Sequence, residues 1–208
     1  MICNYNDFKN WLNHLDYRPK LLLHACCAPC SSHCILFLKK YMDITIFFSN
    51  DNIYPKEEYF NRLNEMNRFV QEIGDDIKVI SSDYNPDDYY NSVKGLEHMG
   101  EKSIRCYNCY RLRLEKTCKL AKKMNFDYFS TTLSISPYKL EKWINEIGFE
   151  LEEKYGVSYL YSNFKKDNGY LHSIELSKEY GLYRQDYCGC IFSFEERKKL
   201  NDWFGKKN

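Results

Sequence analysis

The sequence predicts an α/β fold in which helices cover both faces of a parallel sheet of about five strands. Two observations support this class. Short apolar or β-branched segments alternate with longer amphipathic segments along the chain, which is the pattern of repeated strand–helix units. The 208 residues, 44% of them hydrophobic, are also enough to bury a core without disulfide bonds. We therefore expect a single α/β domain over residues 1–208.

The predicted strands are short and separated by helical patterns. LLLH is apolar enough for a buried strand, and DITIFFS combines β-branched with aromatic residues. Strands are expected at residues 21–24, 43–49, 77–80, 128–133 and 157–162. Because a helical segment follows almost every strand, we expect parallel pairing through crossover connections.

The predicted helices carry local start and stop signals. Ser31 or Ser32 is expected to cap the helix after the first strand, whereas Pro55 opens a long amphipathic helix that Gly74 ends. A short helix is expected inside the polar, tyrosine-rich segment 83–100, which otherwise forms a long functional loop. The remaining helices are expected at residues 31–41, 106–123, 136–155, 171–180 and 192–204.

The overall charge does not indicate a partner. Thirty Lys and Arg residues nearly balance 29 Asp and Glu residues, so any binding of nucleic acid must come from local basic patches. The N-terminal segment lacks the apolar stretch of a signal peptide, and the sequence contains no run of about 18 apolar residues. We expect a cytoplasmic protein that does not enter membranes.

The ten cysteines are the most informative feature of the composition. In a reducing compartment they predict metal binding or redox chemistry rather than a disulfide framework. Cys3, Cys34 and Cys118 are isolated and are expected to pack as small apolar side chains. Seven cysteines form three clusters at strand ends or in loops, namely Cys26, Cys27 and Cys30, then Cys106 and Cys109, then Cys188 and Cys190. The carboxyl ends of parallel strands share one edge, so we expect the clusters to converge there.

The spacing of the clusters favours a cofactor over a local zinc knuckle. Zinc ribbons join two CxxC pairs that lie about 15–20 residues apart, whereas a whole βαβ unit separates Cys30 from Cys106. Soft thiolate ligands select iron–sulfur clusters, zinc or Cu(I), of which we expect an iron–sulfur cluster. Seven thiolates exceed the four that one such centre uses, which leaves three for a second metal or a redox-active dithiol couple.

Two histidines and two aspartates near the clusters are secondary candidates. His24 and His33 flank the first cluster, and His24 is expected to be a hydrogen-bonding neighbour rather than a metal ligand. Asp51 follows the second strand and Asp186 precedes Cys188, so each is a candidate oxygen ligand or proton donor. Exposed loop carboxylates are the alternative for both, and no catalytic residue is assigned beyond them.

Four segments in this order resemble those of one family. They are HACCAPCS at residues 24–31, RCYNCYRLRLEKT at 105–117, TTLSISPYK at 131–139 and YRQDYCGCIFS at 183–193. Over residues 20–193 the chain resembles the QueH family of epoxyqueuosine reductases. The resemblance implies a Rossmann-like fold of the HUP type. It also implies a cobalamin-independent oxidoreductase that removes the epoxide oxygen of epoxyqueuosine, giving queuosine at the wobble position of tRNAs with GUN anticodons.

The resemblance also implies the cofactors and their ligands. A [4Fe–4S] cluster with an adjacent iron ion is expected, together with an electron donor that the sequence does not identify. We hypothesise that this iron polarises the epoxide oxygen while the cluster relays two electrons. The metal ligands carried over by motif are Cys26, Cys27, Cys30, Cys106, Cys109, Cys188 and Cys190, without assignment to one metal or the other.

An unstacked anticodon base would need aromatic and basic contacts beside the cysteines. The residue types and their adjacency to the cysteines suggest such contacts, although surface or packing roles are the alternative for each. The candidates for tRNA contact are Tyr107, Arg111, Ser136, Tyr138, Lys139, Arg184 and Gln185, with Arg105, Tyr110 and Arg113 as further neighbours of the second cluster.

Two other functions are weighed against the reductase. The first is an iron–sulfur-dependent tRNA sulfur transferase of the ATP-pyrophosphatase type. Those enzymes resemble one another in an SGGxDS-like phosphate loop, whereas the corresponding position here holds bulky HACCAPCS. The second is a non-catalytic, zinc-binding tRNA module, which the metal content of the protein would distinguish.

Overall fold

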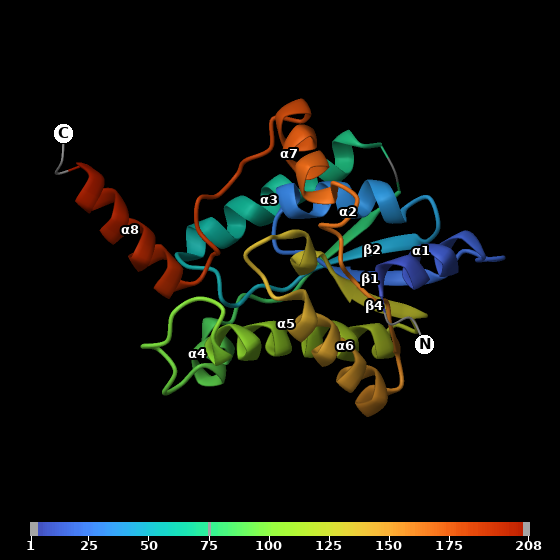
Figure 1. Ribbon diagram of the computed structural model, residues 1–208, viewed down its shortest axis with the longest axis horizontal. Coiled ribbons are helices and arrows are strands. Elements are labelled where there is room, and N and C mark those ends of the chain that lie inside the picture. The colour runs from blue at the N-terminus through green and yellow to red at the C-terminus, as the bar shows by residue number, and fades with distance from the viewer. Residues whose placement is uncertain (1–3, 75, 206–208) are drawn as a thin grey trace.

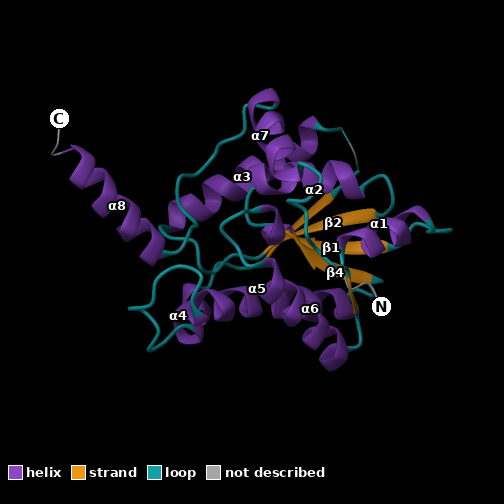
Figure 2. Cartoon of the chain, viewed as in Figure 1, coloured by secondary structure: helices purple, strands orange, loops and turns teal. Residues whose placement is uncertain are grey.

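The computed structural model describes residues 4–74 and 76–205, which form an α/β structure around one five-stranded sheet (Figures 1 and 2). The strand order is β3-β2-β1-β4-β5, and every pairing is parallel. The strands are β1 (Lys20–His24), β2 (Asp43–Phe48), β3 (Lys78–Ser81), β4 (Tyr128–Thr131) and β5 (Ser158–Tyr159). The predicted number and direction of the strands are confirmed.

Helices cover both faces of the sheet, as predicted (Figure 1). On one face lie α1 (Tyr5–Asn13), α2 (Ala28–Leu38), α3 (Lys56–Glu72) and α7 (Gly169–Glu179). On the other lie α5 (Ile104–Lys123) and α6 (Glu141–Tyr155), with α4 (Pro86–Ser92) packed against α5. The last helix, α8 (Ile191–Gly205), extends away from the body of the molecule. This arrangement confirms the Rossmann-like α/β class.

Strand β1 is the centre of the core because it is paired on both edges and covered on both faces. Its register places Leu21 opposite Ile44 of β2 and Tyr128 of β4. Leu21 and Leu23 pack into the core beneath α2 and α3, whereas Leu22 packs into the core beneath α5 and α6. A strand buried in this way requires a continuous apolar run rather than an alternating pattern.

The carboxyl end of β1 is tied to both neighbouring strands by His24. Its Nδ1 lies 2.8 Å from the Thr131 hydroxyl at the end of β4, and its Nε2 lies 3.2 Å from the Ser49 carbonyl after β2. Because a carbonyl oxygen only accepts, Nε2 carries the proton of a neutral ring. The predicted role of His24 as a hydrogen-bonding neighbour agrees with this arrangement.

The beginning of α2 differs from the prediction. The helix begins at Ala28 rather than at residue 31, because a proline is well accommodated in a first turn. Neither serine caps it. The hydroxyl of Ser31 donates to the Cys27 carbonyl at 2.8 Å, and that of Ser32 donates to the Pro29 carbonyl at 3.0 Å. Cys27 therefore occupies the N-cap position, which brings Cys30 into the first turn.

Two boundaries near the end of the sheet also differ from the prediction. The chain leaves β4 after Thr131 and forms a short 3₁₀ helix, η1 (Thr132–Ile135), so the strand predicted to residue 133 is shorter. The helix predicted from residue 136 begins at Glu141, and the strand predicted over 157–162 is only Ser158–Tyr159. Here packing against neighbouring elements outweighs local propensity.

Helix α1 was not predicted, although its sequence carries a start signal. The side chain of Asn4 accepts hydrogen bonds from the backbone N–H groups of Asn6 and Asp7, both at 3.0 Å. Phe8 and Leu12, four residues apart, are the buried positions of the helix. An N-cap asparagine before two apolar residues at this spacing is the pattern that would have identified it.

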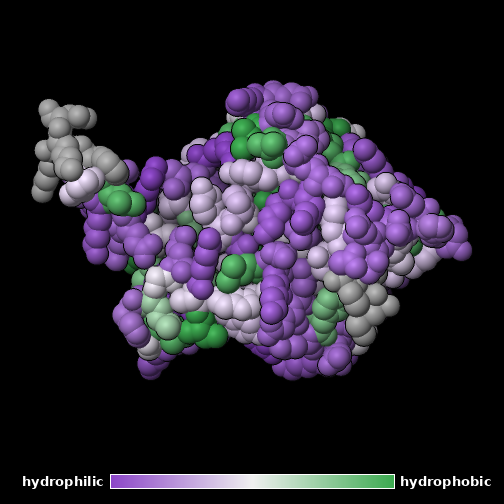
Figure 3. All heavy atoms as spheres, viewed as in Figure 1, coloured by the Kyte–Doolittle hydropathy of each residue, from purple (hydrophilic) through white to green (hydrophobic). Residues whose placement is uncertain are grey.

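The described residues include no helix long and apolar enough to span a membrane. The face drawn in Figure 3 is largely hydrophilic, and its apolar side chains gather in separate small patches.

The pH dependence of unfolding should report the neutral state of His24. Burial, followed by the charge of Arg113, lowers its pKa from 6.5 to about 4. Between these values the unfolded chain binds the proton that the folded chain does not bind. The contribution of His24 to the free energy of unfolding is therefore complete above pH 6.5. It is lost as the pH falls towards 4, by about 1.4 kcal/mol per pH unit.

When the pH is lowered from about 7 to about 5, the free energy of unfolding should fall by about 2 kcal/mol less in His24→Gln than in the parent. Urea unfolding of the metal-free proteins at both pH values measures the difference. His98→Gln, at an exposed position in the loop before α5, is the control and should behave as the parent. An equal loss in His24→Gln and the parent would contradict the prediction.

Candidate metal centre

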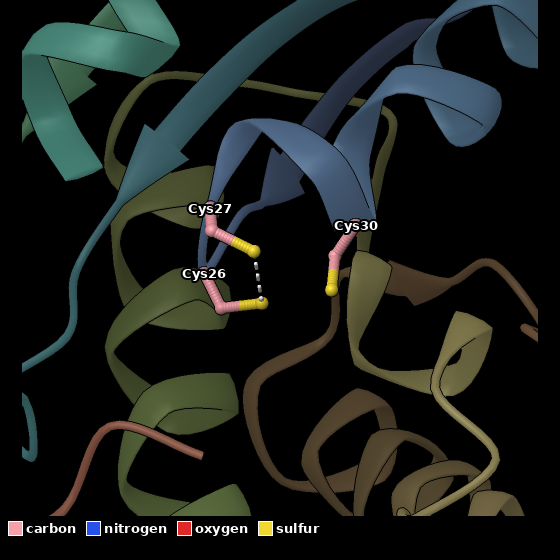
Figure 4. A group of neighbouring side chains, drawn as sticks. All are labelled: Cys26, Cys27 and Cys30. Carbon is pink, nitrogen blue, oxygen red and sulfur yellow. Dashed lines mark hydrogen bonds between the residues drawn. The ribbon is translucent and has the colours of Figure 1, made fainter. Parts of the chain in front are cut away.

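Three thiols meet where β1 gives way to α2 (Figure 4). The Sγ atoms of Cys26, Cys27 and Cys30 lie within 4.8 Å of one another, and those of Cys26 and Cys27 are 3.8 Å apart. Cys26 and Cys27 are buried, whereas Cys30 is half-buried. Within the described part of the chain, this is the one group of three or more potential ligands that meets this distance.

The electrostatics of this group favour one thiolate at Cys27. Hydrogen bonds from Cys26 and Cys30 hold the pKa of Cys27 well below its ordinary value, and Arg62 and Gln185 act in the same direction against burial. The hydrogen bond with Cys27 raises the pKa of Cys26, and hydrogen bonds with Cys26 and then Cys27 raise that of Cys30 more strongly. The free N–H groups at the start of α2 also favour negative charge. Of the three thiols, Cys27 is therefore the one whose surroundings most favour the thiolate form.

The other four clustered cysteines come from α5 and from the segment before α8. Cys109 and Cys190 are buried together against Tyr89 and Val93. Cys106 and Cys188 are half-buried. Burial raises the pKa of Cys109 to about 12, and the neighbouring Cys188 and Cys190 contribute to the increase. Loop and helix thus bring the second and third clusters together, although their role as metal ligands stays a prediction.

The loop before α8 also contacts the first thiol group. The amide Nε2 of Gln185 donates to the Sγ of Cys27 at 3.0 Å. Farther along this loop, the Sγ of Cys188 accepts a hydrogen bond at 3.0 Å from the Nζ of Lys139, which lies just before α6. Through these contacts the segment before α8 lies against the first cluster as well as Lys139, whereas convergence of all seven cysteines on one metal site stays a prediction. The contacts also give two of the predicted tRNA-binding residues, Lys139 and Gln185, direct contact with sulfur.

A close approach explains the glycine between Cys188 and Cys190. Gly189 has a φ of +125°, which L side chains rarely adopt, and a Cβ there would lie 3.1 Å from Nη1 of Arg62. The same Nη1 donates to the carbonyl of Cys188 at 3.4 Å. The CGC segment therefore lies against α3 through its backbone.

Arg62 is a site residue that the sequence-based prediction missed. It is 1% exposed, pairs with Glu58 at 2.7 Å and stacks over the Tyr187 ring. A signal was present, because Arg62 occupies a core-facing position of α3 between Tyr59 and Met66. A charged residue on the apolar face of an amphipathic helix is an exception that calls for a buried partner.

The secondary candidates are engaged with other groups. Asp51 is buried and accepts from Lys116 at 2.6 Å and from the backbone of Asn85 at 3.1 Å. Asp186 pairs at the surface with Arg197. His33 contacts His172 through the two Nδ1 atoms, 2.9 Å apart, rather than the cysteines.

The remaining predicted tRNA-binding residues surround the site less closely. Tyr138 is 65% exposed and lies next to Lys139, and its backbone N–H donates to the hydroxyl of Ser136. The other three make contacts within the protein. Tyr107 packs against Trp143, Arg111 pairs with Glu150, and Arg184 donates to the Ser177 hydroxyl.

The isolated cysteines fit the packing role predicted for them. Cys34 lies in the core on the α2 side of the sheet, and Cys118 lies in the core on the α5 side, both fully buried. Burial raises the pKa of Cys118 to about 11, which keeps the thiol protonated. Cys3 lies outside the described residues.

Comparison with solved structures supports the fold alone. A predicted subunit of a tRNA methyltransferase from Methanocaldococcus jannaschii is similar, with a TM-score of 0.50 and 15% sequence identity. The likeness covers 76% of this chain and 75% of that one. It places the α/β arrangement described above among known folds.

Comparison of sequences is more specific. A family model described as epoxyqueuosine reductase QueH matches residues 21–196. The epoxyqueuosine reductase QueH of Streptococcus pyogenes serotype M1 is 43% identical over 180 residues, covering 85% of this chain and 71% of the relative. That of Thermotoga maritima is 37% identical over 190 residues, covering 90% and 96%. The chain belongs to the epoxyqueuosine reductase QueH family.

Proposed function

We propose that this protein is an epoxyqueuosine reductase, which removes the epoxide oxygen of epoxyqueuosine in tRNA to give queuosine. Family membership and the group of three thiols at the end of β1 support this function. The observation that carries it is the close approach of the Sγ atoms of Cys26, Cys27 and Cys30 inside the protein. A tRNA substrate also supports the expected cytoplasmic location.

The residues present fit an iron–sulfur centre. Cysteine thiolates are its usual ligands, Cys26, Cys27 and Cys30 hold three sulfur atoms within 4.8 Å of one another, and the surroundings of Cys27 favour its thiolate. We propose that the seven clustered cysteines hold a [4Fe–4S] cluster and an adjacent iron ion. The chemistry available from these metals when bound is electron transfer and polarisation of the epoxide oxygen. The electrons would come from an external donor.

The side chains around the cysteines hold the sulfur atoms in place. Gln185 donates to Cys27 and Lys139 donates to Cys188, each at 3.0 Å, which fixes the direction of both sulfur atoms. Cys26, Cys27, Cys109 and Cys190 are buried, whereas Cys30, Cys106 and Cys188 are half-buried. We infer that the modified base approaches from the side of the half-buried cysteines.

Tyr138 is the candidate for contact with the substrate base. It is highly exposed and follows directly on the segment that carries Ser136, one residue from Lys139 at the sulfur of Cys188. A base extruded from the anticodon loop needs an aromatic surface for stacking. We propose that Tyr138 supplies it, with Arg184 as an exposed cation for the tRNA backbone.

The function is tested by anaerobic assay of the iron-loaded protein with tRNA that carries epoxyqueuosine at a GUN anticodon. A chemical reductant supplies electrons, and the nucleosides are identified by mass. Conversion to queuosine is expected. A colourless protein that contains zinc and lacks iron would instead support the zinc-binding module, and sulfur incorporation into tRNA with ATP would support the sulfur transferase.

We expect Cys27→Ser to lower turnover at least about 100-fold, because it replaces the sulfur that is stabilised as a thiolate. Iron content and reductase activity are measured together after identical reconstitution. Cys118→Ala, which alters a buried thiol in the core, is the control and should keep both. Full iron content and activity in Cys27→Ser would contradict the assignment.

Tyr138→Ala should weaken tRNA binding by about 1–3 kcal/mol, the contribution of one base stacked on an aromatic ring. Tyr138→Phe keeps the ring and should bind as the parent does. Fluorescence anisotropy with labelled tRNA at fixed salt measures the affinity. Tyr17→Ala removes a ring of similar exposure before β1, at the opposite end of the strand, and should not change binding. Equal affinities for Tyr138→Ala and Tyr17→Ala would exclude the stacking contact.

A further inference from the structure

Arg113 is a buried cation within the region of the cysteines. It lies one helical turn after Cys109 on α5, is 2% exposed, and donates through Nε to the Cys109 carbonyl at 3.2 Å. Its guanidinium is therefore folded back along α5 to the backbone of Cys109 and over the Tyr110 ring. One terminal nitrogen, Nη2, is buried and has no hydrogen-bond partner among the described residues.

Arg113 also lacks the carboxylate that a buried arginine normally needs. In the described ranges, neither Arg113 nor its neighbour Lys139 forms an ion pair with an Asp or Glu side chain. Of the other two buried arginines near the cysteines, Arg62 pairs with Glu58 at 2.7 Å, whereas Arg105 donates to the Glu97 carbonyl and lies over the Phe192 ring. Buried charges are strongly unfavourable unless another charge compensates them. The counter-charge of Arg113 must come from a different type of group.

The cysteines are the groups placed to supply it. Burial lowers the pKa of Arg113, but its electrostatic coupling to Cys109, Cys188 and Cys26 raises the pKa above the ordinary value. These three residues belong to three different clusters. Lys139 shares the same surroundings, since its Nζ contacts the Sγ of Cys188. Lys139 thus contacts sulfur directly, and Arg113 is held beside Cys109 in the same region.

We propose that Arg113 is a positioning residue, whose permanent positive charge, beside that of Lys139, compensates metal-bound thiolates contributed by all three cysteine clusters. Several thiolates carry more negative charge than the bound metal neutralises, and inside a protein the excess requires a nearby cation. Arginine suits this role because it stays charged when buried. The inference rests on the proposed function only in taking the cysteines as metal ligands, and not on the reaction or the substrate.

The test is Co²⁺ binding by the metal-free protein, followed by the sulfur-to-cobalt absorption band. Arg113→Met keeps much of the side-chain volume and removes the charge, so it should bind Co²⁺ about 10- to 100-fold more weakly. Arg113→Lys keeps the positive charge and should bind Co²⁺ with an affinity within about threefold of that of the parent. Lys119→Met removes an exposed charge from the same helix and should not alter the affinity.

The outcomes separate this inference from the proposed function. Unchanged Co²⁺ affinity in folded Arg113→Met would overturn the inference while leaving the metal centre intact. An equal loss in Arg113→Lys would assign the effect to shape rather than charge and would also overturn it. If Arg113→Met does not fold, Arg113→Gln takes its place with the same expected loss. A parent protein that binds no Co²⁺ through sulfur would overturn both the inference and the proposed metal centre.

Discussion

The carboxyl end of β1 is the constraint on which the rest of the site depends. The strand is paired on both edges and buried on both faces, so its direction is set by the whole core. His24 joins that end to Thr131 and Ser49, and Asn50 donates to the carbonyl of Ala25 at 2.8 Å. The adjacent Cys26 and Cys27 therefore begin from a fixed point. Side chains held by such packing keep a precise geometry that a flexible loop would lose.

The second constraint is charge in a buried region. Cys27, whose surroundings favour the thiolate, and further sulfur atoms from α5 and the CGC segment lie largely away from water. Arg62, Arg113 and Lys139 bring positive charge to the same region from three separate elements. This distribution explains why polar side chains occupy positions that would otherwise be apolar, and it links α3, α5 and the segment before α6 to one site.

The prediction from sequence succeeded where the physical signal is local. Apolar runs and amphipathic periods located all five strands and most helices, because buried faces repeat at the period of the element. It failed at ends. The start of α2 depends on where Cys27 leaves the sheet, and the start of α6 depends on how η1 packs, neither of which is encoded by Ser31, Ser32 or residues 136–140 alone. Arg62 was missed although its position on an apolar face was visible in the sequence.

The donor chemistry of the site was readable from the chain, since the number and spacing of the clustered cysteines predict soft metal ligands without any coordinates. The contacts that these cysteines make with distant residues could not be predicted from the sequence. Gln185 reaches Cys27 across 158 positions and Lys139 reaches Cys188 across 49, and such contacts depend on how whole helices pack on the sheet. Local residues specify which donors exist, whereas long-range packing sets which of them meet and which charges they share.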